Sequence, residues 1–227
     1  ALDREVRAIV APYRFSFVGW EVSHFLGLEQ AHSTAPELVQ EEQNWDILQS
    51  TLRVQILDVL HEMNIHNPAD PHLGLKVTFP PLWFDLTTSP NLLVISPRDR
   101  IENIRSVMLI QDLAPEARDA IEEQVSALGV SALVVPLGGF AGLYPSLIVR
   151  DASFSFVSET IIHEWLHQYL AFTPLGFRYI LDVTGVAPSY EVATMNETAV
   201  SMVAKEVNSR LLEQYYPEYA KQQAEEQ

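Results

Sequence analysis

The sequence predicts an α+β fold in a single domain covering residues 1–227. Short apolar runs bounded by turn residues occupy its middle, which is typical of strands. Segments with apolar residues at helical spacing lie on both sides of these runs. Strands and helices do not alternate as a parallel βαβ arrangement requires. We expect a mainly helical N-terminal portion at residues 1–72 and a core with a small mixed sheet at residues 73–217.

The N-terminal portion is predicted to end in one long helix. One or two helices and a loop near residue 33 are expected before it, and Thr34 is expected to cap it. The helix runs from Pro36, which suits a first turn, to about residue 65, where Asn67-Pro68 stops it. Apolar residues at helical spacing predict one buried face. They are Trp45, Leu48, Leu52, Ile56, Val59 and Leu60.

The middle of the chain predicts five strands from short apolar runs with turn residues between them. These cover residues 75–79, 92–96, 104–110, 130–135 and 146–149. An acidic amphipathic helix is expected at residues 115–128, ended by Gly129. The glycine-rich segment 138–142 is expected to be a turn or a flap, and residues 144–149 an edge strand.

The C-terminal third is predicted to hold two helices with a loop between them. The first covers residues 159–170. Two prolines and two glycines predict a loop from residue 174 to residue 188. The second helix covers residues 191–216, before Pro217, and a solvated tail follows at residues 221–227.

The charge balance narrows the classes of partner. Acidic residues outnumber basic ones 30 to 14, a net charge of −16, which argues against binding to nucleic acid or anionic lipid headgroups. The chain has no cysteine, so disulfides, thiolate zinc sites and thiol catalysis are excluded. Any metal must therefore be held by His, Asp or Glu side chains.

One uncharged stretch is long enough to cross a bilayer, at residues 124–149. Six glycines and prolines interrupt it, so two buried strands around a turn are expected instead. The chain starts without a methionine, and we expect processing or trimming, with membrane tethering through flanking segments left open. Its localisation is not determined, and a membrane-associated or extracytoplasmic site is compatible with the sequence.

The chemistry is concentrated in the motif His163-Glu164-Trp165-Leu166-His167, an H-E-x-x-H pattern. Two histidines four residues apart lie about 40° apart around a helix, so both imidazoles can reach one metal ion. The carboxylate of Glu164 can then face a water at the metal and accept its proton. The metzincin extension of this motif is absent, because Leu170 and Thr173 replace its glycine and histidine.

A catalytic zinc site needs a third protein ligand. The downstream acids are Asp182, Glu191, Glu197 and Glu206. Glu197 is favoured because small residues on its helical face allow close packing against another helix, whereas Glu206 lies about 180° away around the helix. The residues sharing that face are Ala193, Val200, Ser201 and Ala204. Asp182 and Glu191 stay open as alternatives.

The H-E-x-x-H motif followed by Asn196-Glu197-Thr198-Ala199 resembles the gluzincins, the thermolysin-like zinc peptidases, over about residues 145–210. The resemblance implies a zincin-like core, zinc held by His163, His167 and Glu197, and Glu164 as the general base. It also implies a peptide or protein substrate bound along an edge strand, here residues 144–149.

The chain departs from this family at two positions. Ser201 stands where an Asp four residues after the ligand Glu orients a ligand His, so weaker support from Ser201 is expected. No histidine follows His167 to stabilise a tetrahedral intermediate. Tyr179 and Tyr190 are the candidates for that role, and Tyr190 is preferred because it comes just before the ligand helix.

Less specific explanations remain for each part of the pattern. The two motif histidines can be half-buried core residues, and Glu197 can belong to a capping box that starts at Thr194. His61 and His66, five residues apart, lie about 140° apart on a helix and cannot share a metal from one face.

The function expected from the sequence is zinc-dependent hydrolysis of peptide bonds. The alternatives are a zincin-like domain that keeps zinc for structure and acts in binding or regulation, and a membrane-assembly module with an accidental motif.

Overall fold

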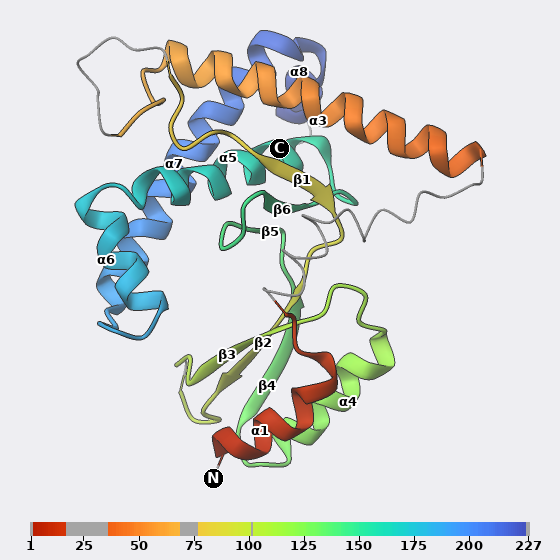
Figure 1. The fold of residues 1–227 in the computed structure, drawn as a ribbon, viewed down its shortest axis with the longest axis vertical. Coiled ribbons are helices and arrows are strands. Elements are labelled where there is room, and N and C mark those ends of the chain that lie inside the picture. The colour runs from red at the N-terminus through yellow and green to blue at the C-terminus, as the bar shows by residue number, and fades with distance from the viewer. Residues whose placement is uncertain (1, 17–35, 69–76, 101, 226–227) are drawn as a thin grey trace. The chain divides into compact units, whose positions relative to one another are not determined.

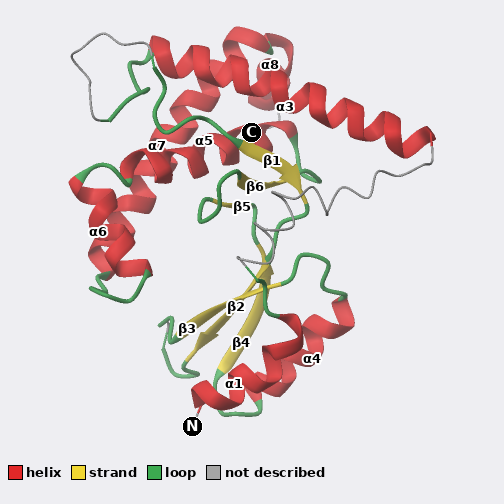
Figure 2. Cartoon of the chain, viewed as in Figure 1, coloured by secondary structure: helices red, strands yellow, loops and turns green. Residues whose placement is uncertain are grey.

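The computed structural model describes residues 2–16, 36–68, 77–100 and 102–225 (Figures 1 and 2). The chain forms two compact units, one from residues 1–31 and 88–138, the other from residues 32–87 and 139–227. Each unit combines helices with its own small sheet, which agrees with the predicted α+β class. The limits of these units differ from the predicted division of the chain at residue 72. The predicted loop near residue 33 and the cap at Thr34 lie outside the described residues.

The first unit is built on a three-stranded antiparallel sheet in the order β3-β2-β4. The strands are β2 (Asn91–Ser96), β3 (Arg105–Leu109) and β4 (Ser131–Pro136). The helices in the described part of this unit are α1 (Leu2–Val10), the 3-10 turn η1 (Ala11–Tyr13) and α4 (Pro115–Ser126). Every second residue of β2 is buried, so one face of the sheet carries the apolar core. The predicted strands and the acidic helix of this region are confirmed.

The second unit contains a small mixed sheet in the order β1-β6-β5. Its strands are β1 (Phe84–Thr87), β5 (Gly139–Phe140) and β6 (Ser146–Val149). β6 runs parallel to β1 and antiparallel to β5, so it is the central strand, and the expectation of an edge strand there is wrong. The expected turn at residues 138–142 contains the edge strand β5. β1 was not predicted, and residues 77–79 of the expected strand 75–79 are irregular.

Among its described residues, the second unit also contains five helices. They are α3 (Pro36–Glu62), α5 (Phe154–Leu170), α6 (Pro174–Val183), α7 (Tyr190–Tyr215) and α8 (Pro217–Glu225). α6 corrects the predicted loop, whereas α8 gives helical structure to residues 217–225 and buries none of them, as expected of a solvated tail. Both start with a proline, which is favoured in a first helical turn. Thr173 caps α6 by accepting a hydrogen bond from the N–H of Gly176 at 3.3 Å. A Cβ at Gly176 would lie 2.0 Å from the Leu170 carbonyl oxygen, so the glycine permits close packing on α5.

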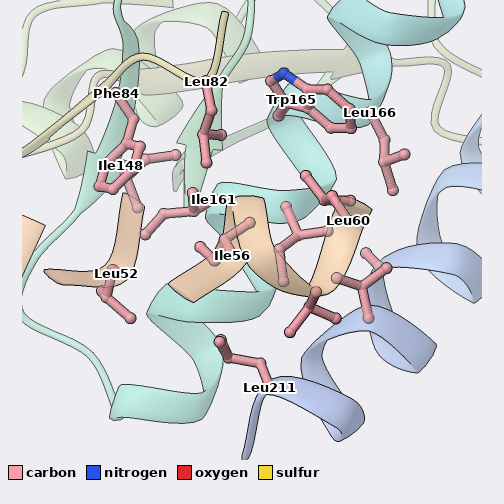
Figure 3. Close-up of a cluster of buried hydrophobic side chains, with 14 of the residues drawn as sticks. Leu52, Ile56, Leu60, Leu82, Phe84, Ile148, Ile161, Trp165, Leu166 and Leu211 are labelled. Atoms are coloured by element: carbon pink, nitrogen blue, oxygen red, sulfur yellow. The ribbon is translucent and has the colours of Figure 1, made fainter. Parts of the chain in front are cut away.

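The core of this unit packs α5 against α3, α7 and the sheet (Figure 3). The predicted face of α3 is buried at Leu52, Ile56, Val59 and Leu60. Trp165 of α5 is buried and its indole N–H donates to the carbonyl of Pro80 at 2.9 Å. This packing orients α5 firmly around its axis. Among the described residues, no helix combines the length and apolarity needed to cross a bilayer.

Candidate metal centre

The H-E-x-x-H motif lies in α5, whose apolar residues anchor one side of the helix in the core. Ser153 caps the helix by accepting a hydrogen bond from the N–H of Phe156 at 3.4 Å. His163 and His167 are only partly buried, and their Nε2 atoms lie 3.1 Å apart. Neutral imidazoles that point both Nε2 atoms at one place have the arrangement of two metal ligands.

Glu197 of α7 completes the group. Its Oε2 lies 3.6 Å from Nε2 of His163 and its Oε1 lies 3.5 Å from Nε2 of His167. Bonds of about 2.0–2.1 Å at tetrahedral angles would separate neighbouring ligand atoms by about 3.3 Å. The separation of the two Nε2 atoms, 3.1 Å, and the separations to the two oxygens of Glu197 lie near that value. Within the described residues, His163, His167 and Glu197 form the group of three side chains that could hold a metal ion.

The start of α7 decides between two explanations for Glu197. Ser189 is the N-cap, and its hydroxyl accepts a hydrogen bond from the N–H of Val192 at 3.3 Å. Thr194 lies inside the helix and donates to the Tyr190 carbonyl at 2.8 Å. The capping-box explanation is therefore wrong. Val200 and Ala204 are buried on the face that packs against α5, as the small-residue pattern predicted.

Asn196 supports the second histidine. Its Oδ1 lies 2.8 Å from Nδ1 of His167. Because an amide oxygen can only accept, this contact places the proton on Nδ1 and leaves the Nε2 lone pair free for a metal. The prediction that Ser201 would do this is wrong, since Ser201 makes no hydrogen bond to either imidazole. The sequence signal for Asn196 was its place directly before Glu197.

Tyr179 reaches the cluster from α6. Its hydroxyl donates to Oε1 of Glu197 at 2.6 Å, and its ring stacks on His167 with centroids 5.4 Å apart. Tyr190 is 82% exposed at the first turn of α7, two turns before Glu197. Of the two tyrosines considered from sequence, the structure brings Tyr179 to the cluster and not the preferred Tyr190. α6, which carries Tyr179, was predicted to be a loop.

Glu164 is 9% exposed and lies against β5. A Cβ built on Gly139 would be 2.7 Å from Oε1 of Glu164, so only a glycine fits there without displacement. Burial raises the pKa of Glu164, against the opposing charges of His167 and His163. A carboxylate with a raised pKa accepts a proton more readily than an exposed one, which suits a general base.

Gln168 holds the segment after β5 in place. Its Nε2 lies 2.9 Å from Oγ of Ser146, 3.3 Å from the Leu143 carbonyl and 3.4 Å from the Ala141 carbonyl. One amide therefore joins the motif helix to the backbone beside Glu164. The sequence offered no signal for this role, because the contact depends on how β5 and β6 pack on α5.

The charges of the cluster are mutually dependent. The His163 and His167 rings hold the pKa of Glu197 far below its usual range, and the Tyr179 hydroxyl adds to this effect. Burial lowers the pKa of His167, but Glu197 more than offsets this and leaves it raised. Burial and then Glu197 raise the pKa of Tyr179, so its hydroxyl stays protonated near neutral pH.

The other candidate acids are engaged elsewhere. Asp182 accepts a hydrogen bond from the N–H of Ser189 at 2.7 Å, and Glu206 pairs with Arg210 at 2.9 Å. Glu191 is exposed and lies 3.2 Å from the Ser189 hydroxyl.

His61 and His66 form a stacked pair with centroids 4.7 Å apart. The Nε2 atom of His61 lies 2.9 Å from Oγ1 of Thr78. Because α3 ends at Glu62, the two rings do not share a helical face, and within the described chain they belong to no three-residue metal group.

No protein-family model matches the chain, no curated protein matches its sequence and no solved structure matches its fold. The candidate metal centre therefore stands on its own geometry and on the chemistry of its donor atoms.

Proposed function

We propose that this protein is a zinc-dependent hydrolase of peptide bonds, with zinc held by His163, His167 and Glu197. The observation that carries the proposal is the convergence of two Nε2 atoms and one carboxylate within 4.8 Å, with a second, buried carboxylate, that of Glu164, on the helix of the two histidines. Two imidazoles and one carboxylate are the ligand set of one class of catalytic zinc sites, in which the remaining position is open.

We propose zinc rather than iron because an H-E-x-x-H pattern on a helix is typical of zinc sites. Iron with two histidines and one carboxylate has ligands on one face of an octahedron, which separates neighbouring donors by about 3.0 Å. The separations of 3.1 Å between the two Nε2 atoms and of 3.5 and 3.6 Å to the two oxygens of Glu197 are compatible with both values. Metal analysis of the purified protein distinguishes the two metals directly.

When bound in such a site, zinc supplies Lewis-acid polarisation of a carbonyl and acidification of a water. Glu164 is the group that accepts the proton of the attacking water, and it passes a proton to the departing amine. Its burial beside Gly139 limits its rotation and keeps the carboxylate beside the cluster. Asn196 keeps the proton of His167 on Nδ1, which is the tautomer that leaves Nε2 free for a metal.

Tyr179 is the candidate for stabilising negative charge on the substrate oxygen. In the structure its hydroxyl donates to Glu197, and its raised pKa keeps it a donor. A donor of this kind stabilises an oxyanion only when it turns from Glu197 to the substrate. Stacking on His167 holds the ring close to the site where that turn would occur.

The test is a peptide-library digest with wild-type protein and Glu164→Gln, both loaded with zinc. Gln keeps the shape of Glu but accepts no proton near neutral pH, so we expect zinc to be retained and cleavage to fall about 10²–10⁴-fold. The matched control is Glu191→Gln, an exposed acid on α7, which should leave both properties unchanged.

Equal cleavage by Glu164→Gln would exclude Glu164 as the base. Zinc-loaded wild type that cleaves no peptide would replace the proposal with the alternative, a structural zinc in a binding or regulatory domain. A preparation without metal whose stability does not change on addition of zinc would reject the metal centre itself.

A further inference from the structure

Five exposed hydrophobic side chains come from α6, the turn that follows it and the first residue of α7. Phe177, Ile180 and Val183 come from α6, Val186 from the turn, and Tyr190 from the first residue of α7. Their exposed fractions are 58%, 39%, 61%, 72% and 82%. The two helices form a hairpin that is closed by the bond from the Ser189 N–H to Asp182. We call these five side chains the hairpin surface.

The helical geometry of α6 places Phe177, Ile180 and Val183 on one exposed face. Positions i, i+3 and i+6 cover an arc of about 120° on a helix. Tyr179, which contacts Glu197, lies about 100° around α6 from the centre of this arc, and Gly176 meets the backbone of Leu170 in the first turn of the helix. α6 packs on α5 and α7, and Figure 1 shows the turn between α6 and α7 at the free end of the hairpin, away from α3 and α8. Exposed hydrophobic clusters of this kind mark surfaces that bind something.

The charges around the hairpin surface restrict what it binds. From residue 172 to residue 190 the charged residues are Arg178 and Asp182, which cancel, in a chain of net charge −16. Arg178 is exposed, and its position on α6 is about 160° around the helix from the centre of the arc formed by Phe177, Ile180 and Val183. Glu191 is the nearest following acid. The neutral hairpin suits an apolar phase with zwitterionic headgroups, while the acidic remainder of the chain is repelled by anionic lipid.

We propose that the hairpin surface inserts into the interface of a zwitterionic lipid bilayer. Its side chains project from one helix face and a turn, so they suit insertion between lipids, and Tyr190 combines an aromatic ring with a hydroxyl, the combination enriched at membrane interfaces. Because Tyr179 of the same helix contacts Glu197, insertion would hold the metal centre close to the membrane surface. The proposal concerns binding alone and does not rest on catalysis.

Co-sedimentation with phosphatidylcholine vesicles tests this proposal. The wild type should partition onto the vesicles. Val183→Asp/Val186→Asp should lose about tenfold or more in vesicle affinity, because charged side chains are costly in an apolar phase. The control is Val54→Asp/Val77→Asp, which makes the same charge change at valines of 68% and 59% exposure in the same unit. This control should bind as the wild type does. Zinc content and melting temperature check that every variant is folded.

A second measurement uses the absence of cysteine from the chain. Val186→Cys and Val54→Cys each create one thiol for a polarity-sensitive fluorophore. Phosphatidylcholine vesicles should shift the emission to the blue at position 186 and leave it unchanged at position 54.

Three results of the vesicle-binding experiment overturn the proposal. They are failure of the wild type to bind the vesicles, equal loss in the control pair, and binding that needs anionic lipid and survives Val183→Asp/Val186→Asp. Self-association of the wild type that this double variant abolishes, without vesicle binding, would assign the surface to a second copy of the chain and also overturn it.

Discussion

Nδ1 of His167 lies 2.8 Å from Oδ1 of Asn196, the residue directly before Glu197. One turn of α7 therefore supplies both the third candidate ligand and the group that orients the second one. The same turn touches α6 through the bond from Tyr179 to Glu197. The candidate metal centre thus depends on the packing of α5, α6 and α7 and not on the motif helix alone.

Removal of the Asn196 carboxamide should weaken metal binding. We expect Asn196→Ala to lower zinc affinity about 10–100-fold, because the His167 ring loses the acceptor that sets its tautomer. Asn196→Asp keeps an acceptor of the same shape and should retain most of the affinity. Competition with a chelator measures these affinities. Ser201→Ala is the control, and a larger loss in that variant than in Asn196→Ala would contradict the assignment.

The two tyrosines should differ in kinetics. Tyr179→Phe keeps the ring that stacks on His167 but removes the hydroxyl, and loss of one oxyanion donor costs about 10²–10³-fold in kcat. Zinc content should stay unchanged. Tyr190→Phe should behave like the wild type. The proposed role of Tyr179 would be rejected if both variants had wild-type kcat, or if the loss appeared in Tyr190→Phe.

Gly139→Ala should disturb Glu164. The added Cβ would lie 2.6 Å from Cγ2 of Thr160 and 2.7 Å from Cγ and Oε1 of Glu164, so at least one of these side chains must move. We expect a loss of about 1–3 kcal/mol in the free energy of unfolding and a lower kcat with retained zinc. In a Glu164→Ala background the same substitution should cost less, because part of the clash is gone. Additive unfolding energies would contradict this coupling.

Metal binding should weaken on acidification. A ligand histidine must be neutral, and Glu197 holds the pKa of His167 above that of an ordinary histidine, which is about 6.5. In the metal-free protein the raised pKa of His167 stabilises the fold fully below about pH 6.5, and this stabilisation is lost as the pH rises through the raised pKa. Zinc competes with the proton on His167, so it binds better as that proton is lost. The increase in melting temperature caused by zinc should therefore grow from about pH 6 to about pH 8. Equal increases across that interval would show that no ligand histidine titrates there.

Local sequence patterns were sufficient for much of this protein. The apolar face of α3, the strands of the first sheet and the helix of the H-E-x-x-H motif follow from periods of 3.6 and 2 residues. The pairing of His163 with His167 follows from the same helical geometry, and the small residues around Glu197 indicated a helix that packs closely. Each of these features depends on residues that are close in sequence, within about one or two helical turns.

Tertiary structure decided the remainder. Pro174 and Gly176 indicated a loop, but Pro174 starts α6 and Gly176 admits the carbonyl of Leu170, a contact that only packing on α5 creates. The choice of Tyr179 over Tyr190 and of Asn196 over Ser201 depends on the angles at which α5, α6 and α7 cross. The central place of β6 depends on its pairing with β1, about 60 residues earlier in the chain. Spacing along one helix predicts which residues share a face, but contacts between elements distant in sequence are set by packing.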